Sequence, residues 1–199
     1  MSPTWRWLRD APWLTPKRLR VYPLMILGVY VALETAWLAL SHGLIDRNGT
    51  PLGADFVAMW TAGRLALHGV PVAAYDQARL LIAQRAALAD PKLALCAFFY
   101  PPIYLLTALP FAALPYLGAL LVWTALGLGV YLVVIRRVVP RPETLLLALA
   151  FPGALVNLTN GQNGFFTAAL LGAGLLSLAE RPFTAGLLFG LLATKPQLA

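Results

Sequence analysis

Four residues in one polar segment have side chains suited to acid–base and anion chemistry. Asp55 lies at the start of an expected short helix, where its carboxylate can accept a proton from a hydroxyl group. The same place also favours an acid for a structural reason, because backbone N–H groups and the helix dipole stabilise negative charge there. Trp60, Arg64 and His68 recur every four residues and share one face of that helix. Asp55 and Arg64 are nine residues apart, so the sequence predicts that they point to opposite faces.

Two cations, Arg64 and Lys195, have either a ligand-binding role or a membrane role. A guanidinium offers a fork of charge-assisted hydrogen bonds to a phosphate, and His68 lies one turn further along the same face. An arginine on a surface helix also reaches lipid headgroups. Lys195 ends an apolar run, so it is either an interface anchor or an anion ligand. Both alternatives stay open for both residues.

Other polar side chains can line a cavity for a polar ligand. Asp76 can bind such a ligand or a divalent ion, but an ion pair with Arg79 three residues on is the simpler expectation. Tyr100 precedes two prolines that fix an extended backbone, so we expect it to shape a cavity wall. Gln162 and Asn163 carry amides in a turn between apolar stretches and can donate hydrogen bonds.

The composition indicates that the elements holding these residues are membrane helices. Of 199 residues, 60% are apolar and only 12% are charged, with 15 Lys and Arg against 8 Asp and Glu. A soluble domain has about 25% charged residues. The one cysteine, Cys96, excludes an internal disulfide, and two histidines are too few for a His-rich metal cage. We therefore expect an all-α polytopic membrane protein with no metal site.

The N-terminal residues predict a membrane anchor. Residues 1–20 contain five Lys or Arg and one acid, and residues 21–41 are apolar apart from Glu34. This pattern predicts a basic cytoplasmic tail and a first transmembrane helix, uncleaved because no Ala-x-Ala exit follows. A carboxylate inside a span is costly, so Glu34 must be protonated, paired or near water. Nucleic-acid binding by the tail is disfavoured because no recognition motif accompanies it.

Residues 42–97 are the polar exception, with nine charges and several turn signals. We expect a loop on the outer side of the membrane that carries two short amphipathic helices, at 55–68 and 72–89, along the membrane surface. Asn48-Gly49-Thr50 matches a glycosylation sequon, but Asn-Gly is also a strong turn dipeptide, and the turn is the preferred interpretation.

Residues 98–199 return to membrane composition. The expected crossings are 116–135, 143–159, 164–180 and 183–199. The stretch 98–114 contains three prolines and is near the lower length limit, so it either crosses or dips in and returns. The dip is favoured, because it keeps the three arginines of residues 136–141 in the cytoplasm with Arg181.

The dip also puts an amide-rich turn at 160–163 on the same side as the 42–97 loop. An unpaired polar group costs several kcal/mol in lipid, so these amides need partners in a cavity or in each other. The amides concerned are those of Asn157, Asn160, Gln162 and Asn163. The alternative is a tight solvated turn. We expect the acid-bearing loop and the amide turn to converge on one outer surface.

Five short elements, in order over residues 53–197, resemble glycosyltransferase family 87. The family's first outer loop is similar to Gly53-Ala54-Asp55-Phe56 with Trp60, then Ala62-Gly63-Arg64, Gly69-Val70-Pro71 and Tyr75-Asp76. Three later elements of the family, Tyr-Pro-Pro, Gly-Gln-x-Asn and Lys-Pro-Gln, are similar to Phe99-Tyr100-Pro101-Pro102, Gly161-Gln162-Asn163 and Lys195-Pro196-Gln197. Each element is weak alone, and their order makes the resemblance more specific.

The resemblance implies a helical bundle of the GT-C superfamily in the cell (inner) membrane. Such enzymes transfer a sugar, typically mannose, from a polyprenyl-phosphate donor to a lipid or glycan acceptor on the non-cytoplasmic face. The resemblance places the general base at Asp55, and we assign the donor phosphate to Arg64, His68 and Lys195. Sugar or acceptor contacts are assigned to Trp60, Asp76, Tyr100, Gln162 and Asn163. The expected partners are the donor, the acceptor and membrane lipids, with no cofactor; metal dependence stays open.

Two other classes stay open beside a glycosyltransferase. A transporter or flippase of a lipid-linked substrate places ionisable groups in broken helices near the midplane, often in repeated halves, and no repeat is found here. A non-catalytic membrane subunit needs no acid at position 55. Members of family 87 are longer than this chain, which stops inside an apolar stretch. We therefore expect an N-terminal portion, inactive alone.

Overall fold

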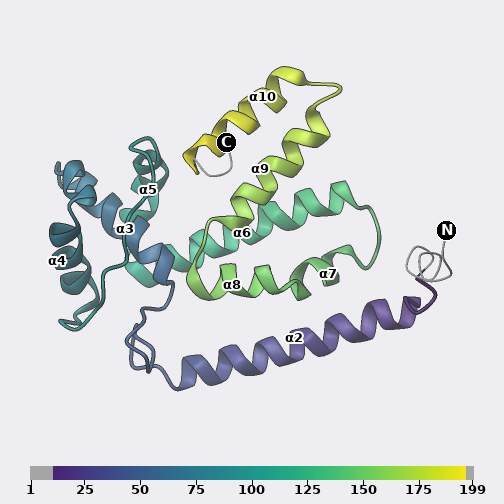
Figure 1. Ribbon diagram of the computed structural model, residues 1–199, viewed down its shortest axis with the longest axis horizontal. Helices are drawn as coiled ribbons and strands as arrows, with labels where there is room; N and C mark the ends of the chain where they lie inside the picture. The colour runs from purple at the N-terminus through teal and green to yellow at the C-terminus, as the bar shows by residue number, and fades with distance from the viewer. Residues whose placement is uncertain (1–10, 196–199) are drawn as a thin grey trace, which may run out of the picture.

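The computed structural model describes residues 11–195 and shows a bundle of helices elongated in one direction (Figure 1). In chain order the elements are α2 (Pro16–Ala39), α3 (Ala54–Leu67), the 3-10 helix η1 (Pro71–Tyr75), α4 (Gln77–Leu88), α5 (Tyr104–Ala112), α6 (Tyr116–Val138), α7 (Thr144–Ala150), α8 (Pro152–Asn160), α9 (Gly164–Ser177), α10 (Pro182–Leu191) and η2 (Leu192–Thr194). The described residues form no β-strand, which confirms the all-α class. Half of the predicted basic tail, at 1–10, and the motif residues Pro196 and Gln197 lie outside the described residues.

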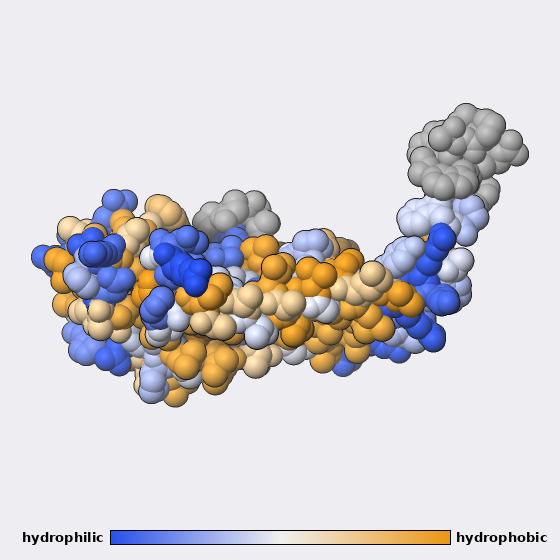
Figure 2. Space-filling view, turned by 90° about the horizontal axis from the view of Figure 1, so that it is seen from below, coloured by the Kyte–Doolittle hydropathy of each residue, from blue (hydrophilic) through white to orange (hydrophobic). Residues whose placement is uncertain are grey.

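Two helices in this part of the chain, α2 and α6, are long and apolar enough to cross a membrane. The 24 residues of α2 rise about 36 Å, more than the roughly 30 Å of a bilayer's hydrocarbon core. Most of its large apolar side chains are exposed, Met25 at 64% and Val31 at 65%. Figure 2 shows a broad apolar band between a more polar end of the molecule and the polar N-terminal end of α2. This surface fits contact with lipid.

The predicted crossing at 143–159 is divided into two short helices. α7 ends at Ala150, α8 begins at Pro152, and Phe151 between them has extended backbone angles. Proline lacks the N–H needed to continue a helix and disfavours helical angles in the residue before it. The stretch is therefore not one continuous helix, and its crossing of the membrane stays a prediction. α9 and α10 are also shorter than the predicted spans at 164–180 and 183–199.

Contacts between side chains show which elements meet at each end of the molecule. Nη2 of Arg20, in the first turns of α2, lies 3.0 Å from a carboxylate oxygen of Glu143, which precedes α7. This contact brings the start of α2 to the basic turn after α6 at residues 136–141. At the opposite end, Tyr116 at the start of α6 donates a hydrogen bond to the carbonyl of Gly53, ahead of α3. α5 lies at that same end, as Figure 1 shows on its left side.

α5 bears on whether 98–114 crosses the membrane. Its nine residues rise about 14 Å, less than half of the hydrocarbon core. It packs on α3 and is followed at once by α6, which begins at the α3 end of the molecule. This geometry is what a dip over 98–114 requires, and the orientation of the chain in the membrane stays a prediction.

α3 is the central helix of the loop region, and it is buried instead of amphipathic as predicted; its position relative to the membrane surface stays a prediction. Its bounds are close to the predicted 55–68, but residues 56–63 are all buried. The helix is apolar around most of its circumference, which is typical of a helix covered on several sides. It packs against α4, α5 and η1. Gly63 permits the close approach of α5, since a Cβ there would lie 2.7 Å from the Ala112 Cβ.

The second predicted loop helix, at 72–89, is divided at Asp76 into η1 and α4. The Asp76 carboxylate accepts hydrogen bonds from the backbone N–H groups of Ala78 and Arg79 and so caps α4. The Asn48-Gly49 turn is confirmed, with Gly49 at a φ of +79°. Asp46 accepts hydrogen bonds from the backbone of this turn.

Candidate functional site

Asp55 lies in the first turn of α3, at a helix start that depends on glycine. Gly53 has a φ of +71°, and a Cβ there would lie 2.8 Å from a methyl group of Leu120. Its N–H donates to the Thr159 carbonyl at 3.2 Å, and the Tyr116 hydroxyl donates to the backbone carbonyls of Leu52 and Gly53. These contacts fix the direction in which α3 begins. The Asp55 side chain itself is exposed.

A cavity of about 440 Å³ opens beside Asp55. α3 forms one side of it, and the segment 95–100 forms the other, with Cys96, Phe99 and Tyr100 in the wall. Burial raises the pKa of the Cys96 thiol, and the negative charge of Asp55 raises it further. The Asp55 carboxylate therefore lies close enough to the opposite wall for its charge to affect the Cys96 thiol.

A buried glutamine that was not among the predicted site residues holds that wall in place. The Gln84 amide nitrogen donates to the Cys96 carbonyl at 2.6 Å, and its amide oxygen accepts the Cys96 N–H at 3.0 Å. Gln84 lies on α4 and is fully buried. A side chain that pairs with both backbone groups of one residue acts like a strand partner for it. The only sequence signal for this role was a glutamine in a predicted helix without an expected partner on that helix.

Tyr100 joins this cavity to the rest of the predicted site. Its ring stacks on the Tyr104 ring, with centroids 4.1 Å apart, and its carbonyl accepts a hydrogen bond from the Tyr75 hydroxyl. The prolines that follow, Pro101 and Pro102, line an adjoining cavity of about 410 Å³ together with Tyr100. The Tyr-Pro-Pro element thus forms cavity wall.

A row of polar contacts continues from Tyr104 to Lys195. The Asn163 amide nitrogen donates to the Tyr104 hydroxyl at 3.2 Å, and Lys195 Nζ donates to the Asn163 amide oxygen at 3.0 Å. Asn163 is buried, 5% exposed. The row Tyr100, Tyr104, Asn163 and Lys195 therefore brings three separate sequence elements together.

An apolar cavity of about 270 Å³ lies beside this row. Aromatic and aliphatic side chains of α5, α6, α9 and α10 form most of its lining, and its polar lining residues are Tyr104, Thr107, Asn163, Thr167 and Thr194. A polar edge on an otherwise apolar cavity suits an amphipathic ligand.

The amide turn and the start of α3 are in direct contact, as the sequence predicts. A Cβ on Gly161 would lie 2.7 Å from the Phe56 Cβ and 3.6 Å from the Gly53 Cα. The Trp123 indole N–H donates to the Gly161 carbonyl at 3.0 Å. Gln162 is half-buried in this turn.

The amide nitrogens of the other predicted amides, and Glu34, have local partners, whereas the buried Asn157 Oδ1 has none among the described residues. The amide nitrogens of Asn157 and Asn160 donate to backbone carbonyls one turn earlier in α8. Glu34 accepts a hydrogen bond from the Thr159 hydroxyl at 2.5 Å, which meets the expectation that it is paired. Since the Thr159 carbonyl also accepts the Gly53 N–H, α2 is linked through α8 to the start of α3.

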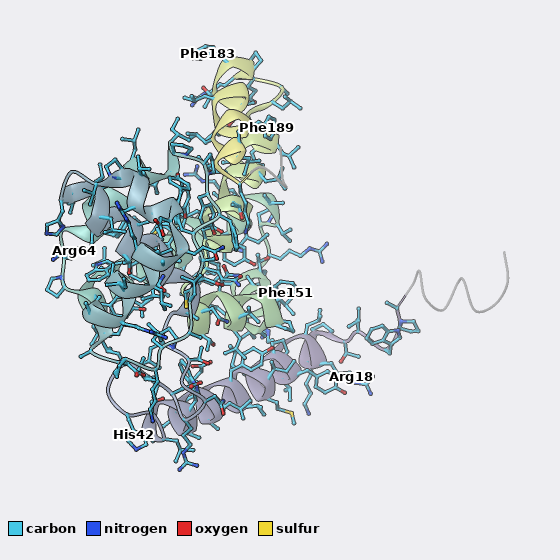
Figure 3. All side chains as sticks on the ribbon, turned by 60° about the vertical axis from the view of Figure 1, so that its left-hand side comes forward. Arg18, His42, Arg64, Phe151, Phe183 and Phe189 are labelled. Carbon is cyan, nitrogen blue, oxygen red and sulfur yellow. The ribbon has the colours of Figure 1, made fainter. Side chains whose placement is uncertain are left out.

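Arg64 and His68 lie toward the other end of α3 and face a different cavity. Nine residues of helix separate Asp55 from Arg64 by about 14 Å along the axis and on opposite sides. Arg64, His68 and Trp60 line a cavity of about 420 Å³ between α3 and α4, which shares no lining residue with the cavity at Asp55. Figure 3 shows Arg64 at the outer edge of this group of helices. The structure does not bring these residues to Asp55.

Asp76 has the ion pair that its spacing predicts. Its carboxylate lies 3.6 Å from Arg79 Nε, in addition to capping α4. In the part of the chain that the structure describes, no three His, Cys, Asp or Glu side chains lie close enough together to hold a metal ion.

Comparison with known proteins finds one match. The model of a protein family described as "Glycosyltransferase family 87" matches residues 98–199. This region contains the Tyr100 wall, the amide turn and Lys195, and it lies beside Asp55 in space although it excludes Asp55 in sequence. No curated protein and no solved structure matches the chain.

Proposed function

Because the chain belongs to glycosyltransferase family 87, and is therefore a membrane glycosyltransferase, we propose that it uses a polyprenyl-phosphate sugar as donor. The sugar is mannose, and the acceptor is a lipid or glycan on the non-cytoplasmic face. The observation that carries this proposal is the placement of Asp55. Its exposed carboxylate lies on a cavity whose opposite wall, residues 95–100, includes Phe99 and Tyr100 of the family-matched region.

Asp55 is the general base of the proposed reaction. Within residues 11–195 no hydrogen bond or ion pair engages its carboxylate, so its lone pairs can accept the proton of an acceptor hydroxyl. As the proton moves to Asp55, the hydroxyl oxygen bonds to the anomeric carbon of the sugar. The bond from that carbon to the phosphate oxygen breaks, and polyprenyl phosphate leaves with the electron pair. Such proton transfer contributes about 10²- to 10⁴-fold in rate.

The donor phosphate is assigned to Lys195. The phosphate oxygen and the attacking hydroxyl both bond to the anomeric carbon, so the phosphate must reach the Asp55 side of α3. Arg64 and His68 line a different cavity on the opposite side of α3, and Arg64 lies about 14 Å further along its axis. Their assignment to the donor phosphate stays a prediction that the geometry does not favour. Lys195 supplies a cation at the end of the polar row that starts at Tyr100.

The apolar cavity between α5, α6, α9 and α10 suits the first isoprene units of the donor. It begins at Asn163, which holds the Lys195 ammonium, and continues along Trp123, Leu126 and Phe166. A lipid phosphate bound to Lys195 would thus lead directly into an apolar channel. Asn163 and Gln162 remain the candidate donors to sugar hydroxyls.

The distribution of basic residues supports the proposed orientation. The start of α2 and the turn after α6 lie at one end, and both are rich in Lys and Arg. Positive residues next to spans are retained in the cytoplasm. Asp55 lies at the opposite end, together with the mixed charges of residues 42–97, and therefore on the outer face.

The experiment that tests this function uses membranes from cells expressing the full-length protein that contains this chain. Transfer is measured with polyprenyl-phosphate mannose and, in parallel, with a nucleotide-linked mannose. The proposal predicts transfer from the lipid donor alone, reduced at least about 100-fold by Asp55→Asn. Asp90→Asn changes another acid of the same loop, one that caps a surface turn, and leaves transfer unchanged. Transfer from the nucleotide donor, or normal transfer by Asp55→Asn, would overturn the proposal.

A further inference from the structure

We propose that the cavity between α3 and α4 is a second binding site, specific for a phosphate-bearing ligand and separate from the cavity at Asp55. The cavity has a volume of about 420 Å³. One wall carries Trp60, Thr61, Arg64 and His68, and the facing wall of α4 consists of alanines. A cationic wall opposite small apolar side chains leaves room for a ligand beside the cation.

The first observation is a buried hydroxyl without a partner. Thr61 is 1% exposed, and its Oγ1 has no hydrogen bond within the described residues. A threonine inside a helix normally donates to a carbonyl three or four residues earlier. Buried polar atoms without partners are rare because leaving one unpaired is costly. A ligand oxygen in this cavity would supply the missing acceptor.

The second observation is that most donors of Arg64 are unused. Its Nη1 reaches the Ala112 carbonyl at 3.5 Å, the limit for a hydrogen bond, and its guanidinium lies 5.5 Å from the centre of the Trp60 ring. No carboxylate pairs with Arg64 in the part of the chain described. The cation–π contact with the indole holds the guanidinium near the Trp60 ring, while its other N–H groups stay available to an anion. Two parallel bonds to phosphate oxygens use that geometry fully.

His68 completes the wall one turn further along. Its Nδ1 lies 2.7 Å from the Arg64 carbonyl, so the ring donates there and turns Nε2 away from the helix backbone. The Thr61 hydroxyl, the Arg64 guanidinium and the His68 imidazole therefore share one face of α3. An arginine that only reached lipid headgroups would need neither the indole beneath it nor the buried hydroxyl beside it. The phosphate comes either from a lipid headgroup or from free phosphate.

Binding is tested on the full chain in an uncharged detergent by calorimetry. The probes are dihexanoyl phosphatidic acid, inorganic phosphate and, as a phosphate-free control, dihexanoylglycerol. Wild type is expected to bind a phosphate probe and not dihexanoylglycerol. Arg64→Gln is expected to raise the Kd at least about tenfold, because a charge-assisted pair is lost. Arg79→Gln, on the outer side of α4, is the matched control and leaves the Kd unchanged.

Thr61→Val is the variant that separates a binding role from a packing role. Valine keeps the shape and removes only the hydroxyl, so folding is retained. The proposal predicts an unchanged or higher Tm together with a Kd raised about fivefold, since one hydrogen bond is lost. A Kd equal to that of wild type would overturn the role of Thr61 and with it this site.

The two phosphate probes identify the source of the phosphate. Tighter binding of phosphatidic acid supports a lipid headgroup, and equal binding of inorganic phosphate supports a free ligand. Binding of neither probe, or equal binding by wild type and Arg64→Gln, overturns the proposal. Asp55→Asn is expected to bind like wild type, because the two cavities share no residue. The result is therefore independent of the proposed transferase reaction.

Discussion

The two ends of α3 differ in how far their polar groups connect to the rest of the molecule. At the N-terminal end, Asp55 faces a wall held by Gln84, and that wall leads through Tyr100 to Lys195. At the other end, the cavity at Arg64 is lined by α3 and α4, and Arg64 reaches the end of α5. The first end combines segments that are distant in the sequence, and the second combines α3 with the nearby α4. A reaction with two substrates needs the first kind of site, whereas binding one headgroup needs only the second.

This difference shows what helix periodicity can and cannot supply. The spacing of Trp60, Arg64 and His68 correctly places them on one face of α3, opposite Asp55. Periodicity does not say which other elements cover each face. The cover at the Asp55 end comes from residues 95–100 and 160–163, which are distant in sequence. A cation near the base therefore had to be sought in those segments.

Apart from loss of the base, the largest change in transfer is expected from Lys195→Met. This variant removes the cation that the polar row connects to the cavity at Asp55. Methionine keeps the length of the side chain but cannot donate to a phosphate. The KM for the polyprenyl-phosphate donor is expected to rise about 10- to 100-fold, as for loss of a hydrogen bond to a charged group. Steady-state kinetics with varied donor measure this effect.

Lys92→Met provides the control, since Lys92 lies in a turn away from both cavities. Its KM is expected to equal that of wild type. A normal donor KM in Lys195→Met, with a raised KM in Arg64→Gln, would reverse the assignment of the two ends and return the donor phosphate to Arg64.

A smaller effect is expected from Gly161→Ala, which disturbs the contact between the amide turn and α3. The new Cβ would lie 2.7 Å from the Phe56 Cβ, and the backbone φ of +62° disfavours a side chain. Overpacking of this kind costs about 1–3 kcal/mol. We expect a lower Tm in detergent and reduced transfer. Gly118→Ala, where nothing lies within 4 Å, should leave both unchanged; equal Tm values for the two variants would contradict the close packing of Gly161.

The smallest effect is expected at Cys96, whose thiol reports on the charge of Asp55. Burial is the main cause of its raised pKa, and the Asp55 charge adds to it. Asp55→Asn removes that charge, so the pKa falls, the thiolate fraction at a fixed pH rises, and alkylation speeds up. The gain is less than about tenfold because burial remains. Asp90→Asn should leave the alkylation rate unchanged. Equal rates in wild type, Asp55→Asn and Asp90→Asn would contradict an effect of the Asp55 charge on Cys96.

The same thiol tests which side of the membrane holds the Asp55 end. An impermeant maleimide is expected to label Cys96 in right-side-out vesicles. Preparations with the opposite orientation should label only after permeabilisation. The reverse pattern would place the cavity at Asp55 on the cytoplasmic side and invert the proposed orientation.

Features set by local sequence were predicted well. The existence of α2 and α6 follows from apolar length, although α2 begins at Pro16, inside the predicted tail, and the ion pair of Asp76 with Arg79 follows from helix spacing. The topology argument based on charge placed the amide turn on the same side as the 42–97 loop, and the contact of Gly161 with the start of α3 agrees with that placement. These properties depend on a few neighbouring residues or on the membrane itself.

Features set by tertiary contacts were missed. α3 has the composition of either a surface or a buried helix, and only the packing of α4 and α5 decides between them. Gln84 pairs with the Cys96 backbone, and Tyr104 contacts Asn163. No spacing rule connects the residues of either contact. Pro152 was a sequence signal for the helix break at Phe151, but the apolar run around it favoured one crossing.

The most direct test of the Asp55 end as the reaction centre is a single-turnover measurement with polyprenyl-phosphate mannose and acceptor both saturating. This condition separates the chemical step from donor binding. For Asp55→Asn we predict a rate lowered about 10²- to 10⁴-fold, with the donor Kd within about threefold of wild type. A single-turnover rate equal to that of wild type would contradict the account, because the proton of the acceptor would then leave by another group.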